Sequence, residues 1–257
     1  MPPVTRPPEP GSGAALGLPA DITTCLFDLD GVLTKTAVVH AAAWKQMFDE
    51  FLAGLDAAQQ PFDGRADYDR YVDGKPRYDG VRSFLQSRSI ELPEGEPSDP
   101  PSANTICGLG NRKNDLVQEL IERDGVEAYP GSVEYVAKAK AAGLQLAVVS
   151  SSANCKAILK SCGMLDSFQE IMDGEVAAER GIKGKPAPDT FLAAAAALGA
   201  EPAQATVYED ALAGVQSGRS GNFGFVVGVD RVGQADALKE HGADVVVQDL
   251  KELMEQG

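Results

Sequence analysis

Two carboxylates separated by a single residue follow a short apolar segment near the start of the chain. Residues 22–27 are mostly apolar or β-branched, and Asp28-Leu29-Asp30-Gly31 comes directly after them. Such a segment is typical of a buried parallel strand. Side chains alternate along a strand, so Asp28 and Asp30 can face one site at its carboxyl edge. An ordinary Asp-Gly turn explains these residues equally well. The choice between a turn and a functional site therefore depends on the rest of the sequence.

Three further polar clusters occur later in the chain, two of them directly after apolar segments. They are Ser150, Ser152 and Asn154, then Lys185, and then Glu209 and Asp210. Parallel strands of a doubly wound sheet end at one edge, so we expect all four clusters to converge there. Taken singly, each is better explained as a turn, a solvated loop or a helix start. Together they form a chemically coherent set.

The four carboxylates in this set predict a bound cation. Two unit charges about 4 Å apart repel by roughly 4 kcal/mol at an effective dielectric constant near 20. A hard divalent ion such as Mg²⁺ suits carboxylate oxygens, and Lys185 would add a second positive charge. The Ser150 hydroxyl and the backbone amides after it can bind an anion. A metal, a lysine, a hydroxyl and a nucleophilic carboxylate together indicate phosphoryl transfer through an aspartyl-phosphate.

Composition excludes several other classes of function. The chain has 257 residues, is 44% hydrophobic and carries a formal net charge of -15, which argues against nucleic-acid and anionic membrane partners. No apolar run of about 18 residues is present, so no membrane span is expected. The four cysteines lack metal-site spacing, and nothing marks the chain as secreted. Reduced thiols and a cytoplasmic location are therefore expected. A monomer is compatible with the sequence.

The order of apolar and helical patterns predicts the elements that position these clusters. From residue 126 onward strands alternate with helices, which predicts an α/β fold with a doubly wound parallel sheet. The first strand belongs to that sheet, so residues 21–37 and 126–257 are expected to form one catalytic core. Residues 38–125 show helical patterns without a convincing strand, which predicts an inserted all-helical cap. Residues 1–20, rich in Pro, Gly and Ala, are expected to be a disordered N-terminal tail.

The predicted elements can be stated by residue range. Strands are expected at 22–27, 144–150, near 171, and at 205–208, 223–229 and 244–247. Helices of the core are expected at 132–142, from about 153, and at 188–199, 211–218 and 234–241. In the cap, apolar residues at helical spacing predict helices around 44–55, 81–85 and 105–123.

The four ordered motifs resemble those of phosphotransferases of the haloacid dehalogenase superfamily, and within it those of the β-phosphoglucomutases. The resemblance covers roughly residues 22–250. It implies that Asp28 is the nucleophile and Asp30 the general acid/base. Ser150 and Lys185 would hold the transferring phosphoryl group, with Ser152 and Asn154 as candidate substrate contacts. Mg²⁺ would be held by Asp28, the backbone carbonyl of Asp30, and Asp210, with Glu209 alongside.

The helical segment carries further residues that match the mutases. Gly74 to Asp79 resembles a cap loop whose arginine holds the distal phosphate of a bisphosphorylated sugar, which implies that role for Arg77. Lys113 resembles a sugar or hinge contact, His40 a histidine just past the hinge, and Thr36 a hinge threonine. Each also has a simpler explanation, because a surface arginine or an isolated structural histidine is common. Lys35 departs from the pattern, since aspartate is usual there.

The resemblance implies conversion of β-glucose 1-phosphate to glucose 6-phosphate through β-glucose 1,6-bisphosphate, so the expected partner is a small phosphorylated sugar. The main alternative is a phosphatase of small sugar phosphates or related metabolites, which would use the same core residues and admit water. A non-catalytic regulator that binds phosphosugars is a third alternative. The intact residues Asp28, Asp30, Lys185 and Asp210 count against it.

Overall fold

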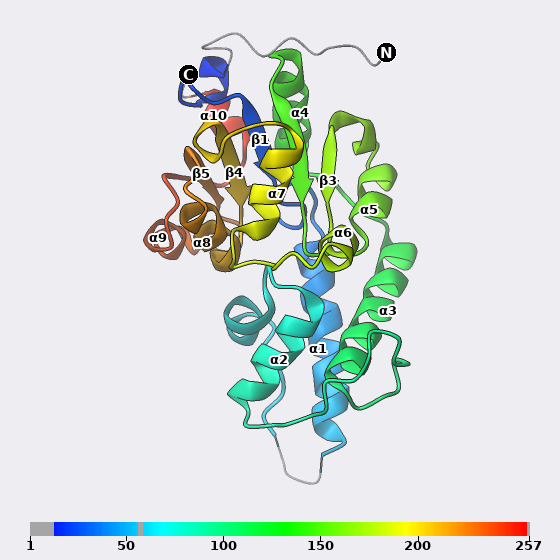
Figure 1. Ribbon diagram of the computed structural model, residues 1–257. Coiled ribbons are helices and arrows are strands. Elements are labelled where there is room, and N and C mark those ends of the chain that lie inside the picture. The colour runs from blue at the N-terminus through cyan, green and yellow to red at the C-terminus, as the bar shows by residue number, and fades with distance from the viewer. Residues whose placement is uncertain (1–12, 56–58, 256–257) are drawn as a thin grey trace. The chain divides into compact units, whose positions relative to one another are not determined.

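The computed structural model describes residues 13–55 and 59–255, which form two compact units (Figure 1). One unit contains the described residues up to Thr34 together with those from Ala128 onward, and the other is Lys35–Glu127. The chain therefore leaves the first unit after one strand and re-enters it just before the first helix that packs on the sheet. The sequence placed these two crossings a few residues further into the insertion, after residues 37 and 125.

The first unit is built on a six-stranded sheet with the strand order β3-β2-β1-β4-β5-β6. Every neighbouring pair is parallel, so all strands end at the same edge. The doubly wound parallel sheet predicted from the alternating pattern is confirmed. The strands are β1 (Thr24–Phe27), β2 (Gln145–Val149), β3 (Glu170–Met172), β4 (Ala205–Glu209), β5 (Phe225–Val229) and β6 (Val245–Val247).

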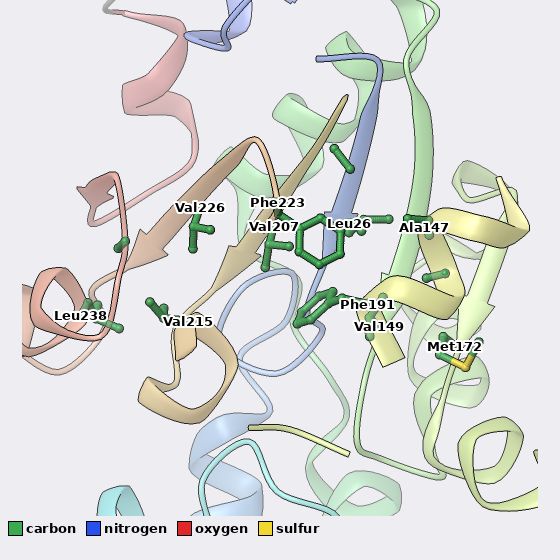
Figure 2. Close-up of a cluster of buried hydrophobic side chains, with 14 residues drawn as sticks. Leu26, Ala147, Val149, Met172, Phe191, Val207, Val215, Phe223, Val226 and Leu238 are labelled. Carbon is green, nitrogen blue, oxygen red and sulfur yellow. The ribbon is translucent and has the colours of Figure 1, made fainter. Parts of the chain in front are cut away.

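Alternate residues of the central strands enter two different cores. Leu26 and Val207 face a cluster that includes Phe191 of α7 (Asp189–Ala197) and Val215 of α8 (Leu212–Ser220), as Figure 2 shows. On the other face Phe27 stacks on Tyr208, with ring centroids 4.3 Å apart, and both rings contact Tyr135 of α4 (Pro130–Ala141). Burial on both faces explains why these strands appear in the sequence as nearly continuous apolar segments.

The remaining α-helices among the described residues of this unit are short. They are α5 (Cys155–Ser161), α6 (Gly174–Glu179), α9 (Ala235–Glu240) and α10 (Lys251–Met254). The sequence pattern located α5 and α9 but did not indicate α6 or α10. Each of the four cysteines in the chain is a free thiol.

The second unit is helical, and no strand occurs among its described residues. Its α-helices are α1 (Ala37–Ala53), α2 (Arg77–Ser87) and α3 (Ile106–Asp124), with a π-helical turn at Tyr68–Val72. An aromatic core joins them: Phe48 of α1 stacks on Trp44 and lies 4.1 Å from Phe84 of α2, measured between ring centroids. Thr105 caps the amino end of α3, its hydroxyl accepting a hydrogen bond from the Gly108 amide at 2.9 Å. The all-helical insertion predicted from periodicity is therefore present.

The expectation of a disordered tail through residue 20 is wrong for the part that the structure describes. Ala14–Leu16 form a 3₁₀ turn, and Leu16 and Leu18 are only 2% and 6% exposed. The hydroxyl of Tyr135 donates a hydrogen bond to the Leu16 carbonyl at 3.0 Å. The composition of the whole segment concealed two leucines that are buried against the α/β unit. Residues 1–12, where the rest of that expectation falls, lie outside the described residues.

The two crossings between the units are neighbours in space. The Lys35 amide donates to the Glu127 carbonyl at 2.8 Å, and the Tyr129 amide donates to the Leu33 carbonyl at 3.0 Å. Thr34 and Ala128 form an antiparallel bridge. Among the helices of residues 13–55 and 59–255, none combines the length and the apolar character that crossing a membrane requires.

Candidate active site

The centre of the site is an ion pair between the end of β1 and the loop before α7. Asp28 directly follows β1, and its amide donates to the Tyr208 carbonyl of β4 at 2.9 Å. Its Oδ1 atom accepts a hydrogen bond from Lys185 Nζ at 2.5 Å. Lys185 is only 2% exposed and also donates to the Val149 carbonyl at the end of β2, at 3.0 Å. One ammonium thus connects the ends of two strands.

Glu209 and Asp210 complete a group of three buried carboxylates. Lys185 Nζ lies 2.6 Å from Oε1 of Glu209, the last residue of β4. Asp28, Glu209 and Asp210 each have a carboxylate oxygen within 4.8 Å of the others. Gly214 of α8 leaves the room for Glu209, because a Cβ at that position would collide with the Glu209 carboxylate. The polar clusters after β1 and β4 and the loop lysine therefore meet, as the strand-edge argument predicted.

Burial and the neighbouring charges both shift the pKa values of this group. It raises the pKa of Asp28 well above its ordinary value of 3.8; Lys185 opposes the rise, while Glu209 and Asp30 add to it. For Lys185 burial alone would lower the pKa of the ammonium, but the charges of Asp28 and Glu209 outweigh burial and raise it. The lysine is held in its charged form, and it is shared between two carboxylates.

Asp30 lies on a tight turn beside this group and is half-buried. Gly31 follows it with φ +81°, a backbone conformation that favours glycine. The Asp210 carboxylate occupies the space that a Cβ at Gly31 would need. The turn that carries Asp30 is therefore packed directly against Asp210. The Asp30 side chain is not part of the three-carboxylate group. From the sequence, Asp30 was expected to bind the metal only through its backbone carbonyl.

The serine cluster forms the next loop along the same edge of the sheet. Ser150 follows β2 and is buried, and its amide donates to the Met172 carbonyl at 2.9 Å. The Ser150 hydroxyl oxygen accepts from the Ser152 amide at 3.1 Å, and the Ser152 hydroxyl oxygen accepts from the Asn154 amide at 3.2 Å. These bonds are those of an ordinary turn before α5. Ser150 adjoins Val149, whose carbonyl binds Lys185.

A fifth loop at this edge escaped the sequence argument. Residues 230–234 follow β5, and Arg231 Nε donates to the Gly31 carbonyl at 2.6 Å. Gln234 Nε2 donates to the Asp210 carbonyl at 3.0 Å. The only signal in the sequence is Asp230-Arg231, two charged residues directly after an apolar strand. Bonds from side chains to backbone carbonyls leave no residue pattern that could have identified these partners.

The remaining predicted residues belong to the helical unit and form two groups within it. Lys113 Nζ lies 2.8 Å from His40 Nδ1 and 4.9 Å from the ring of Trp44. Thr36 is buried at the start of α1, and its carbonyl accepts from the His40 amide at 2.9 Å. The other group surrounds Arg77, the first residue of α2.

Arg77 contacts its neighbour Tyr78. Its Nη2 atom donates to the Tyr78 hydroxyl at 3.1 Å, and its guanidinium lies 4.9 Å from the centre of that ring. The Tyr78 hydroxyl in turn donates to Asn111 Oδ1 at 2.9 Å. Gly74 occupies the preceding turn with φ +69°. Arg77 is therefore a half-buried member of a polar network rather than a solvated surface residue.

The carboxylate group fits a hard divalent cation. Three buried carboxylates face a single ammonium, so the group is negatively charged when all of its members are ionised. Burial is the main cause of the raised pKa of Asp28, and the charges of Glu209 and Asp30 add to it. Mg²⁺ takes oxygen ligands, commonly one or two carboxylates with water and substrate phosphate. Asp28, Glu209 and Asp210 all offer such oxygens, and the Lys185 ammonium pairs with both Asp28 and Glu209.

Comparisons with known proteins agree with this geometry. The profile of the haloacid dehalogenase-like hydrolases matches residues 22–222. The chain is 54% identical over 248 residues to a β-phosphoglucomutase of Mycobacterium bovis, covering 93% of this chain and 94% of that protein. It is 34% identical over 229 residues to a β-phosphoglucomutase of Bacillus subtilis, covering 89% and 90%.

A solved structure supports the same assignment. The crystal structure of β-phosphoglucomutase from Clostridium difficile superposes with a TM-score of 0.72 at 26% sequence identity, covering 90% of this chain and 93% of that one. The resemblance inferred from the four motifs is therefore confirmed. The chain belongs to the haloacid dehalogenase-like hydrolase family, as an enzyme similar to the β-phosphoglucomutases.

Proposed function

We propose that the protein is a Mg²⁺-dependent phosphoryl-transfer enzyme that converts β-glucose 1-phosphate to glucose 6-phosphate through β-glucose 1,6-bisphosphate. The observation that carries the proposal is the position of Asp28: its carboxylate is buried, paired with Lys185, and grouped with Glu209 and Asp210. The substrate follows from the similarity to β-phosphoglucomutases. A phosphorylated sugar is thus the expected partner.

In the proposed reaction Asp28 takes and returns the phosphoryl group. One Asp28 carboxylate oxygen attacks phosphorus of the bisphosphate, the bond to the sugar oxygen breaks, and Asp30 gives a proton to that oxygen. In the second half Asp30 removes the proton from the sugar hydroxyl, which attacks phosphorus and releases Asp28. Acid/base help of this kind typically contributes about 10²–10⁴-fold. The cycle leaves Asp28 as a carboxylate and Asp30 in its starting protonation state.

The other residues of the group are assigned to bind the phosphoryl group and to neutralise its negative charge. Lys185 neutralises negative charge on the transferring phosphoryl oxygens and holds the Asp28 carboxylate in place. Ser150, on the adjoining loop, is assigned a hydrogen bond to the same phosphoryl group. Mg²⁺, when bound to Asp28, Asp210 and the Asp30 carbonyl, would offset the carboxylate charges and the charge of the phosphoryl group. Glu209 also pairs with Lys185, at 2.6 Å, and so helps to hold it.

The helical unit is assigned the recognition of the sugar. Arg77 would hold the distal phosphate, His40 and Lys113 would contact the sugar, and Thr36 and Gly74 would shape the hinge and the cap loop. Ser152 and Asn154 are assigned to the core side of the substrate. Exclusion of water during the transfer would then favour the sugar hydroxyl over hydrolysis.

A coupled assay tests this function. The purified chain is given β-glucose 1-phosphate, catalytic β-glucose 1,6-bisphosphate and Mg²⁺, and glucose 6-phosphate and inorganic phosphate are measured in parallel. Glucose 6-phosphate is expected as the main product. Phosphate release without glucose 6-phosphate would instead identify a phosphatase of small sugar phosphates, which needs only the same core residues. Absence of both products with this and other sugar phosphates would contradict phosphoryl transfer.

A further inference from the structure

The loop at residues 230–234 is closed on itself and tied to two strands. Asp230 Oδ1 accepts hydrogen bonds from the Gly233 and Gln234 amides at 2.7 and 2.8 Å. The Asp230 amide donates to the Val247 carbonyl at the end of β6, at 2.7 Å. These bonds restrict the backbone of the loop, and they therefore also restrict where the side chains of Arg231 and Gln234 begin.

From this loop Arg231 binds the turn that follows Asp30. Its Nε atom donates to the Gly31 carbonyl at 2.6 Å and its Nη1 atom to the Gln248 carbonyl at 2.5 Å. The guanidinium lies over the Tyr129 ring, 3.5 Å from its centre, in a cation–π contact. These three contacts leave the guanidinium little freedom, so the position of the Gly31 carbonyl is fixed as well.

Gln234 holds the second segment of the site. Its Nε2 atom donates to the Asp210 carbonyl at 3.0 Å. The Asp210 carboxylate is packed against Gly31, at the place where a Cβ would stand. Arg231 and Gln234 therefore hold the two backbone segments that meet in this contact, and one rigid loop determines how far apart they lie.

We infer that Arg231 and Gln234 are positioning residues for the reacting groups. Neither is assigned a contact with substrate or metal; Arg231 acts through the Asp30-Gly31 turn and Gln234 through Asp210. This inference rests on the proposed roles of Asp30 as acid/base and Asp210 as metal ligand. It adds the loop after β5 to the ends of β1, β2 and β4 and the Lys185 loop, whose side chains are assigned the chemistry.

The chain offers a matched control in Arg219. Its Nε and Nη2 atoms donate to the Gly242 carbonyl at 3.0 and 2.6 Å, and Nη2 also pairs with Asp244 at 2.5 Å. Asp244 accepts from the Val226 amide near the beginning of β5, so this arginine works at the amino edge of the sheet. Arg219 thus makes the same kind of bond as Arg231, but at the edge opposite Asp30 and Asp210.

The experiment compares Arg231→Met, Arg231→Lys and Gln234→Leu with Arg219→Met. Steady-state kinetics gives kcat, KM for the sugar phosphate and the Mg²⁺ concentration for half-maximal rate. Hydrogen exchange of residues 28–34 and 210–212 is measured in the metal-free proteins. For Arg231→Met we expect kcat to fall about 10–100-fold with KM within about threefold, since small misplacements of reacting groups cost that much. For Gln234→Leu we expect about 10-fold weaker apparent Mg²⁺ affinity.

The other variants define what counts as support. Arg231→Lys keeps a cation that can reach the Gly31 carbonyl and should recover part of kcat; it replaces Arg231→Met if that protein does not fold. Exchange in residues 28–34 should be faster in the Arg231 variants and unchanged in Arg219→Met. Equal kcat in the Arg231 and Arg219 variants, or unchanged exchange in residues 28–34, overturns the inference. An inactive wild-type protein would instead refute the proposed function, and the exchange comparison would still decide whether Arg231 fixes the turn.

Discussion

Lys185 Nζ lies 2.5 Å from Oδ1 of Asp28, although the two residues are 157 positions apart in the chain. The contact forms because β1 ends beside β2 and β4, whose ends carry the Val149 carbonyl and Glu209 that also bind the ammonium. Both side chains are buried. The site therefore depends on the assembly of β1, β2 and β4, and Lys185 partly offsets the charge of the buried carboxylates.

Replacing Lys185 with Met tests how much its ammonium stabilises the buried carboxylates. The change leaves Asp28, Glu209 and Asp210 buried without the ammonium, so we expect a loss of about 3–5 kcal/mol in the free energy of unfolding of the metal-free protein. Turnover should also be lost. Urea denaturation in EDTA measures the first effect. Lys138→Met is the control, because Lys138 pairs with Glu134 on the surface and its loss should change stability little.

Replacing Asp28 with Asn should abolish the phosphoenzyme. We expect the rate to fall at least about 10³-fold, as is usual when a nucleophile is removed. Rapid quenching with labelled β-glucose 1,6-bisphosphate measures protein-bound phosphate directly. Asp30→Asn is the matched variant: it should lower turnover by about 10²–10⁴-fold and still accept label on Asp28. Protein-bound label in Asp28→Asn would remove this residue as the nucleophile.

The stability of the metal-free protein should depend on pH through Asp28. Burial raises the pKa of Asp28 in the folded protein above its ordinary value of 3.8. At a pH between the ordinary pKa and the raised pKa, the folded form therefore holds a proton that the unfolded form has released. Stability attributable to Asp28 therefore falls as pH rises through this window. Thermal unfolding in EDTA, compared between wild type and Asp28→Asn, isolates the effect. A difference that grows in favour of wild type with rising pH would contradict it.

Gly214→Ala tests the space behind Glu209. In the interior of a helix this change usually stabilises by about 1 kcal/mol. Here the added methyl group would collide with the Glu209 carboxylate, so we expect a lower melting temperature together with a lower kcat. Gln216→Ala in the same helix is exposed and should leave both unchanged. A Gly214→Ala protein that is more stable and fully active would show that Glu209 can move without consequence.

The sheet could be predicted because its strands are buried on both faces. Residues 145–149 and 205–209 are almost uninterrupted apolar or β-branched segments, and a parallel sheet converts such segments into one edge where their polar ends meet. The grouping of Asp28, Glu209 and Asp210 follows from that geometry, and Lys185 joins them from the loop before α7. No side-chain detail was needed to foresee it.

Other features depend on contacts that leave no pattern in the sequence. The turn at Ala14–Leu16 is held by a hydrogen bond from Tyr135 and by burial of two leucines, within a segment whose composition suggests disorder. Arg231 and Gln234 bind backbone carbonyls, which every residue has. In the helical unit, periodicity showed which faces are apolar but not that Arg77 would join Tyr78 and Asn111.

The close pairing of the two crossings has an evolutionary consequence. The chain departs through Thr34 and returns through Ala128, which are bridged to each other, and Lys35 pairs with Glu127 through both backbone and side chain. A polypeptide whose ends sit together can be exchanged for a different one without stretching the sheet it interrupts. Under the proposed assignment of sugar recognition to the helical unit, evolution can replace this unit and change the substrate while it keeps the residues of the α/β unit that are assigned to phosphoryl transfer.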